Sequence, residues 1–293
     1  MKVGFIGLGN LGTPIALNIL ESGHELYVYN RTSSKTQPLV EKGAIACESI
    51  EQLSKQCTIV CTMVADDAAI TNVCTGQQGL INQLAPGSIH ISMSTILPQT
   101  AAELAEQHKK SNLHYISAPV FGRPEVARAR KANFVVSGDE KIRKQIEPLL
   151  KDAGGAGIWD FGDAITTANT VKLCGNFCIA SAMEAIGESI ALAQKSGVDA
   201  QKMWDMFTQT IFNSPLYIMY SKIIANEQFE PAAFSMQLGL KDMNLVLQQA
   251  QQAEQAMPLA QLLQQQMQLL VKEGKQNIDW SAVSQATQYK NNL

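Results

Sequence analysis

Residues 1–12 read MKVGFIGLGNLG, a short apolar run that passes directly into the glycine pattern GxGxxG. Such a run followed by this pattern is typical of a buried parallel strand that turns sharply into a helix. Gly7 allows the tight turn, Gly9 lets a pyrophosphate approach the backbone, and Gly12 lets the helix pack closely on the strand. The helix directs its positive N-terminal end at the phosphates. We therefore expect a Rossmann unit whose dinucleotide contacts come from Gly7, Leu8, Gly9, Asn10, Leu11 and Gly12.

The second expected strand, residues 25–29, ends in Asn30-Arg31-Thr32 rather than in an acidic residue. An acidic side chain at this place binds the ribose 2′-hydroxyl of NAD and repels the 2′-phosphate of NADP. Arg31 offers a planar cationic fork for a phosphate, and Asn30 and Thr32 add neutral donors, so the sequence favours NADP over NAD. In an alternative interpretation, Arg31 stacks on the adenine ring, which suits either cofactor.

Short β-type runs alternate with helical stretches up to residue 163, which is typical of a parallel sheet with crossover helices. Beyond the first two, the expected strands are 44–47, 58–63, 88–92, 113–117, 134–137 and 157–161. After residue 163 the pattern becomes helical, over 166–195, 200–209, 214–225, a stretch after Phe234, and 258–273. We expect an α/β Rossmann domain with a doubly wound parallel sheet over 1–163, and an all-helical domain over 164–293 joined to it by a long helix.

Ligands of an open parallel sheet bind beyond the carboxyl ends of its strands. In this chain that rule singles out Met63 and Val64 after one expected strand, Ser94 and Thr95 after another, and the loop that begins at Ala118-Pro119. We expect Met63, Val64 and Thr95 to contact the cofactor and Ser94 to contact the substrate.

The overall composition favours small-molecule partners. The chain has 23 Lys and Arg against 26 Asp and Glu, a net charge of −3, with no basic run suited to nucleic acid or to an acidic membrane. Its six cysteines form no CxxC pair and do not alternate with histidines, so we interpret them as buried, reduced thiols and expect no metal site. Without a signal peptide or a membrane span, the protein is expected to be cytoplasmic.

Lys172 lies in an unusual helical segment, because residues 171–183 are apolar or small nearly all round. Burial of an ammonium is costly and lowers its pKa toward the range useful for proton transfer. Asn176 follows one helical turn later on the same face. Lys172 is therefore a candidate general acid/base for a hydride-transfer reaction, with Asn176 beside it. Two structural alternatives stay open, a lysine that snorkels to the helix edge or one that pairs with Glu184 or Glu188.

Six motifs are spread over nearly the whole chain: GLGNLG at 7–12, NRT at 30–32, MST at 93–95, APV at 118–120, KLCGN at 172–176 and KD at 241–242. Together they resemble the β-hydroxyacid dehydrogenase family, which includes 3-hydroxyisobutyrate dehydrogenase and glyoxylate/succinic semialdehyde reductases. The resemblance implies that Lys172 is the catalytic lysine and Asn176 its companion, that Thr95 contacts the nicotinamide end, and that Lys241 closes over the cofactor. It also implies a helical domain that assembles a homodimer or homotetramer.

The loop that holds the substrate departs from this family. The family pattern is Pro-Val-Ser-Gly-Gly, whereas this chain reads Pro119-Val120-Phe121-Gly122-Arg123. Phe121 removes a hydroxyl and adds an apolar wall, while Arg123 either grips a carboxylate or phosphate or points into solvent. The candidate substrate-binding residues are Ser94, Phe121, Gly122 and Arg123.

The leading hypothesis is an NADP-dependent oxidoreductase that interconverts a small hydroxyacid, or a related alcohol, with its aldehyde or ketone. One alternative is an imine reductase, which shares this architecture but commonly has another residue in place of the lysine. A second is a non-catalytic, NADP-binding scaffold protein, since a fold alone does not prove activity.

Overall fold

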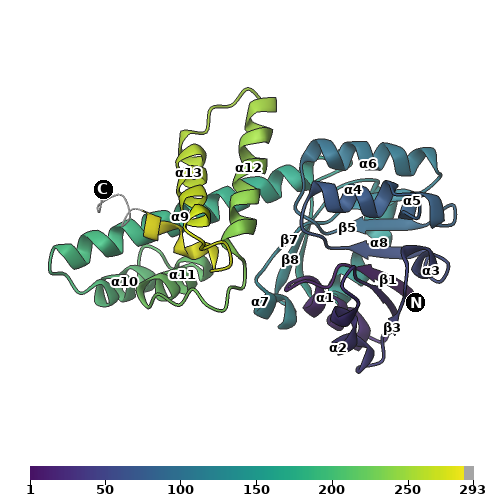
Figure 1. Cartoon of the computed structure of the whole chain (residues 1–293), viewed down its shortest axis with the longest axis horizontal. Helices are drawn as coiled ribbons and strands as arrows, with labels where there is room; N and C mark the ends of the chain where they lie inside the picture. The colour runs from purple at the N-terminus through teal and green to yellow at the C-terminus, as the bar shows by residue number, and fades with distance from the viewer. Residues whose placement is uncertain (287–293) are drawn as a thin grey trace. The chain divides into compact units, whose positions relative to one another are not determined.

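The computed structural model describes residues 1–286 (Figure 1). The chain forms two compact units, which divide between Lys172 and Leu173, inside the long helix α9 (Thr167–Lys195). Each unit is described below by itself.

The first unit contains the parallel six-stranded sheet that the sequence predicts. Its strand order is β3-β2-β1-β4-β5-β6, and every neighbouring pair is parallel. The strands are β1 (Lys2–Ile6), β2 (Glu25–Tyr29), β3 (Ile45–Ala46), β4 (Ile59–Thr62), β5 (Ile89–Ser92) and β6 (His114–Ser117). The order reverses direction at β1, so the topological switch point, where ligands of such sheets bind, lies between the carboxyl ends of β1 and β4.

Helices connect these strands, and alternate side chains of β1 explain how they cover both faces of the sheet. The helices are α1 (Gly12–Glu21), the 3-10 helix η1 (Ser33–Thr36), α2 (Gln37–Val40), α3 (Ile50–Ser54), α4 (Asp67–Thr75), α5 (Leu80–Gln83) and α6 (Pro98–Lys110). Val3 and Phe5 belong to a core with Ile15 of α1, whereas Ile6 belongs to a second core with Ile70 of α4. Successive strand residues point to opposite faces, so β1 contributes to both cores.

The last two expected strands do not extend the large sheet. They form a second sheet of three strands in the order β7-β8-β9, with β7 (Val120–Phe121), β8 (Ala132–Val136) and β9 (Gly155–Asp160). β7 is antiparallel to β8, which is parallel to β9. The helices α7 (Pro124–Arg128) and α8 (Glu140–Asp152) follow β7 and β8. β7 has two residues, too few for a periodic sequence signal, and for that reason the sequence analysis missed it.

The second unit is helical, as predicted. It contains α10 (Ala200–Gln209), α11 (Pro215–Ala225), α12 (Met236–Gln252), α13 (Pro258–Lys272) and the 3-10 helix η2 (Trp280–Gln285). The stretch expected after Phe234 is α12, which begins where the Ser235 hydroxyl accepts a hydrogen bond from the Leu238 amide. Within residues 1–286, no helix combines the length and the apolar character needed to cross a membrane.

The cysteines differ in part from the expectation. Cys47, Cys57, Cys61 and Cys74 are buried, but Cys174 and Cys178 are exposed on α9. Their four-residue spacing places both on one stripe of the helix, and a run of apolar and small residues does not reveal which stripe is covered.

Cys74 lies in a buried polar cluster with two histidines, His90 of β5 and His108 of α6. α4 and α6, which carry Cys74 and His108, run beside each other (Figure 1). The candidate metal-ligand atoms of Cys74, His90 and His108 all lie within 4.8 Å of one another, a grouping that the spacing of these residues in the sequence does not suggest.

Hydrogen bonds fix the protonation state of both rings in this cluster. His108 Nδ1 donates to the Leu104 carbonyl at 2.7 Å, so His108 Nε2 accepts from His90 Nδ1 at 3.0 Å. His90 Nε2 in turn accepts from the Thr62 hydroxyl at 2.8 Å. All four ring nitrogens are thus engaged with both rings neutral, and an ion would have to displace the bond between the rings. Burial lowers the pKa of His108 from 6.5 to about 4 and the pKa of His90 well below 6.5.

Candidate active site

The glycine loop between β1 and α1 is shaped by two close backbone approaches. Gly7 has a φ of +101°, and a Cβ atom there would lie 2.2 Å from the Met63 carbonyl oxygen. A Cβ atom on Gly12 would lie 2.1 Å from the Gly7 carbonyl oxygen. A Cβ atom on Gly9 would meet no atom within 4 Å. Gly7 and Gly12 are therefore required by the packing of the protein backbone itself. The space over Gly9 is open to a ligand and fits a pyrophosphate.

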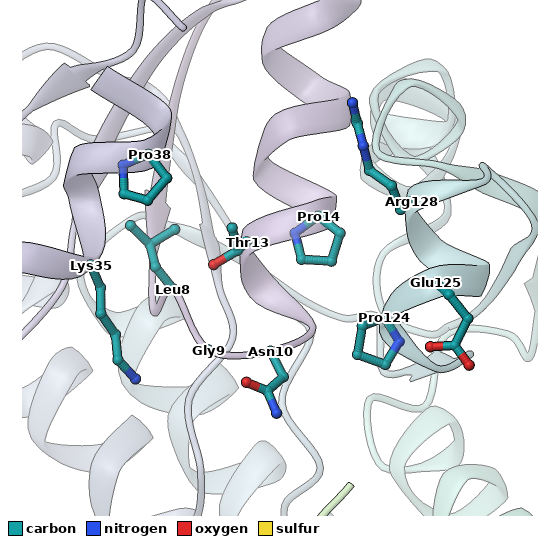
Figure 2. Close-up of a pocket in the computed structure, with 10 residues that line it drawn as sticks. All are labelled: Leu8, Gly9, Asn10, Thr13, Pro14, Lys35, Pro38, Pro124, Glu125 and Arg128. Carbon is teal, nitrogen blue, oxygen red and sulfur yellow. The ribbon is translucent and has the colours of Figure 1, made fainter. Parts of the chain in front are cut away.

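A cavity of about 540 Å³ opens beside this loop (Figure 2). Figure 2 shows the loop segment from Leu8 to Asn10 between Lys35 on one side and Pro124 and Glu125 on the other. The residues that line the cavity are Leu8, Gly9, Asn10, Thr13, Pro14, Lys35, Pro38, Pro124, Glu125 and Arg128. The cavity thus lies at the N-terminal end of α1, where a helix favours a phosphate group.

Asn30 braces the loop from the end of β2. Its Oδ1 accepts a hydrogen bond from the Leu8 amide at 2.9 Å, and its Nδ2 donates to the Thr32 carbonyl at 2.9 Å. The Asn30 amide group, which the sequence analysis treats as a phosphate donor, is thus engaged with the backbone.

Arg31 and Lys35 supply positive charge at the same end of β2. Both side chains are exposed, and Lys35 also lines the cavity. Arg31 is predicted from the sequence and Lys35 is not, although Lys35 follows four residues later in η1, directly after the Asn30-Arg31-Thr32 motif. Neither cation forms an ion pair with another of the residues 1–286. Both cations are therefore available to an anionic ligand.

The loops that follow β4 and β5 are tied together by Ser94. Its hydroxyl accepts a hydrogen bond from the Val64 amide at 2.9 Å, and the residue is 2% exposed. On the other side, the Met63 amide donates to the Ile6 carbonyl at 2.9 Å. Met63, Val64 and Ser94 thus form one connected edge beyond the carboxyl ends of the sheet, and Thr95 follows in the same loop.

Arg123 does not point into solvent. Its side chain is 15% exposed, and its Nε donates to Glu125 Oε1 at 3.1 Å. It follows Phe121 and Gly122 and directly precedes Pro124, the first residue of α7. The structure thus holds the guanidinium within the loop that the sequence assigns to the substrate.

Lys172 is buried, at 8% exposed, and its Nζ lies 4.1 Å from the centroid of the Phe121 ring. The two structural alternatives for this lysine do not fit the helix. A buried side chain does not snorkel to a solvated edge, and Glu184 and Glu188 lie 12 and 16 residues further along α9, which corresponds to about 18 and 24 Å. One turn before Lys172, Asn169 is 2% exposed.

In the second unit, Asn176 and Lys241 meet at one carboxylate. Asn176 Nδ2 donates to Asp242 Oδ2 at 2.5 Å, and Lys241 Nζ lies 2.6 Å from Asp242 Oδ1. Asp242 is 0% exposed and Asn176 is 3% exposed. Asp242 is part of a motif in the sequence, but its contact with Asn176 is not predicted, because the two residues are 66 positions apart and give no local sign of it.

Two known protein families together match nearly the whole chain. Residues 2–168 match the family described as the NAD binding domain of 6-phosphogluconate dehydrogenase. Residues 166–287 match the family described as "NAD-binding of NADP-dependent 3-hydroxyisobutyrate dehydrogenase".

Individual relatives agree with these matches over their full length. The chain is 40% identical to the uncharacterized oxidoreductase YfjR of Bacillus subtilis, over 97% of this chain and 98% of the relative. It is 29% identical to glyoxylate/succinic semialdehyde reductase 1 of Arabidopsis thaliana, over 99% of each chain. Among solved structures, Psf3 in complex with NADP+ and 2-OPP has a TM-score of 0.89 and 25% identity, over 97% of this chain and 99% of that one.

Proposed function

Because the chain belongs to the β-hydroxyacid dehydrogenase family and is an NAD(P)-dependent oxidoreductase, we propose that it uses NADP to interconvert a small hydroxyacid, or related alcohol, with its aldehyde or ketone. The observation that carries the proposal is the burial of Lys172 in the first turns of α9, at 8% exposed. A buried lysine at this place is suited to exchange a proton with the oxygen of a carbonyl compound.

The cofactor is held by the first unit in this proposal. The open backbone at Gly9 and the N-terminal end of α1 face the pyrophosphate. Arg31 and Lys35 bind the 2′-phosphate that distinguishes NADP from NAD. Leu8, Asn10 and Leu11 complete the loop, and Met63, Val64 and Thr95 lie along the nicotinamide half. The family resemblance assigns Lys241 to the cofactor as well.

Bound NADPH supplies the hydride, and the protein supplies the proton and the orientation. Lys172 Nζ gives its proton to the substrate oxygen in reduction and takes it back in oxidation. Asn176, oriented by Asp242, hydrogen-bonds the same oxygen. Ser94, Phe121, Gly122 and Arg123 hold the remainder of the substrate, and the Arg123 guanidinium suits a carboxylate.

The proposal is tested by following NADPH oxidation with a panel of substrates that includes glyoxylate, succinic semialdehyde, larger semialdehydes and a cyclic imine. Turnover of a semialdehyde with NADPH, faster than with NADH, supports it. Turnover of the imine alone supports an imine reductase instead. Tight NADPH binding without turnover of any compound contradicts the proposal and favours a binding protein.

We also propose that the chain assembles as a homodimer or homotetramer. The second unit carries large apolar side chains that are well exposed, with Leu192 at 69%, Ile211 at 71% and Met206 at 51%. Large apolar side chains that are exposed in a single chain are suited to burial in contacts between subunits. Light scattering coupled to gel filtration measures the assembly, and a monomer at micromolar concentration contradicts this part of the proposal.

A further inference from the structure

We infer that Phe121 is a positioning residue that holds the Lys172 ammonium on the face of its ring through a cation–π contact. The inference rests on the proposed role of Lys172 in proton transfer. It gives the aromatic residue in the substrate loop a function of its own, apart from forming a wall of the site.

The geometry of the pair supports this contact. Lys172 Nζ lies 4.1 Å from the Phe121 ring centroid, well inside the distance of about 6 Å at which the ring quadrupole attracts a cation. The attraction grows when the cation is removed from water, and Lys172 is 8% exposed. Both residues belong to the first compact unit.

The backbone keeps the ring in its place. Phe121 pairs with Asn133 across the antiparallel strands β7 and β8. The side chain of Asn133 is itself held, because its Oδ1 accepts a hydrogen bond from Trp159 Nε1 of β9 at 2.8 Å. The ring therefore extends from the edge of a three-stranded sheet, whereas the lysine reaches it through a flexible chain of four methylene groups.

This arrangement has two consequences for the lysine. The ring face restricts Nζ to one of the many positions that its rotatable side chain can reach. It also favours the ammonium over the neutral amine, because the attraction acts on the positive charge. The fixed position of Nζ serves proton transfer in either direction. Reduction of a carbonyl requires a proton on Nζ when the hydride is transferred, so the preference for the ammonium suits the reductive reaction.

A role of Phe121 in packing alone makes a different prediction. Leucine supplies an apolar side chain but no aromatic face, whereas tyrosine retains the face. Fluorinated phenylalanines keep the shape of the ring and withdraw electron density from its face, so they weaken the cation–π contact with little change in volume.

The experiment measures kcat and the KM for NADPH with the best semialdehyde substrate. We expect Phe121→Leu to lower kcat about tenfold, the equivalent of a buried cation–π contact, without change in the KM for NADPH. Phe121→Tyr should recover most of this loss. Site-specific replacement of Phe121 by mono-, di- and trifluorophenylalanine should lower kcat stepwise with each fluorine. The same series at Phe207 of α10 is the matched control and should leave kcat unchanged.

A kcat that stays constant across the fluorinated series at position 121, or a Phe121→Leu variant as active as the unmodified enzyme, overturns the inference. The fluorinated series decides the question even where Phe121→Leu folds poorly. If Lys172→Ala retains full turnover, the proposed function fails. If Lys172→Ala is inactive while the fluorinated series is flat, only the role of Phe121 fails.

Discussion

The Asn176 amide donates to Asp242 Oδ2 across 2.5 Å, and this bond fixes the orientation of the amide. An ionised carboxylate only accepts hydrogen bonds, so the Asn176 nitrogen, and not its oxygen, must face Asp242. The second carboxylate oxygen of Asp242 lies 2.6 Å from Lys241 Nζ. One buried acid thus orients two residues to which the family resemblance assigns contacts with substrate and cofactor.

We expect Asp242→Asn to lower kcat about tenfold or more, because it removes the charge that orients both partners. It should also destabilise the protein by about 1.5–3 kcal/mol, the range for a hydrogen bond to a charged group. Turnover assays and urea unfolding measure the two effects. Asp205→Asn, which changes an exposed carboxylate of α10, is the control and should alter neither. Normal activity of Asp242→Asn contradicts an orienting role.

Lys172→Ala should reduce turnover at least about a hundredfold, the usual contribution of a general acid/base. The dissociation constant for NADPH should stay the same, because the proposed cofactor contacts lie elsewhere. Stopped-flow turnover and fluorescence titration with NADPH separate these quantities. Lys195→Ala, at the other end of α9, is the matched control. Near-normal turnover of Lys172→Ala would show that another group transfers the proton.

Arg31→Ala should raise the KM for NADPH about tenfold to a hundredfold and leave the KM for NADH nearly unchanged. The range corresponds to the loss of one charge-assisted hydrogen bond. Lys35→Ala should act in the same direction, and Lys144→Ala on α8 serves as the control. Steady-state kinetics with both cofactors check the prediction. An equal rise with NADPH and NADH would indicate that Arg31 stacks on the adenine instead.

Gly9→Ala should affect cofactor binding, whereas Gly12→Ala should affect the stability of the fold. A Cβ atom at Gly9 meets no protein atom within 4 Å, so we expect an unchanged melting temperature and a raised KM for NADPH. A Cβ atom at Gly12 lies 2.1 Å from a carbonyl oxygen, so Gly12→Ala should lower the melting temperature even without cofactor. Calorimetry of the cofactor-free protein, together with kinetics, tests both. A melting temperature equally reduced in the two variants would argue against an open site over Gly9.

From the buried His90–His108 pair we predict that the free energy of unfolding decreases as the pH is lowered. The folded protein holds the pKa of His108 at about 4, against 6.5 ordinarily, so the unfolded chain binds the proton more readily. The contribution of His108 to the free energy of unfolding is complete above pH 6.5. It is lost as the pH falls toward 4, and the loss amounts to at most about 3 kcal/mol. Urea unfolding between pH 7.5 and 4.5 should show this decrease in the free energy of unfolding with falling pH. His108→Gln should make the decrease smaller, whereas His114→Gln, on the exposed end of β6, should not.

The parts of the fold that the sequence predicts are those whose signal is local. The strand, glycine loop and helix of residues 1–21 follow one another along the chain, and each carries its own periodicity or turn residues. β7 escapes prediction because two residues carry no period. Cys74, His90 and His108 come from a helix, a strand and another helix, so only the packing of α4 and α6 in the folded protein brings them together.

The same distinction applies to the candidate site. Burial of Lys172 follows from the apolar segment around it, but its aromatic partner at position 121 is 51 residues away and lies on the smaller sheet. Pairing of Lys172 with Glu184 is compatible with the composition of the segment and fails because a helix advances about 1.5 Å per residue. Asp242 could be found only from the tertiary contact.

The hydrogen bonds that Asn30 forms with the loop have a consequence for the cofactor preference of this enzyme. Its oxygen holds the Leu8 amide, and an aspartate at position 30 has an oxygen at the same place. A single Asn30→Asp exchange would therefore keep the acceptor for the Leu8 amide and add the negative charge that disfavours a 2′-phosphate, but it would lose the donor to the Thr32 carbonyl. Position 30 thus joins two tasks in one side chain: its oxygen supports the glycine loop in either residue, and the exchange of its NH2 group for a second oxygen would turn the proposed preference for NADP towards NAD.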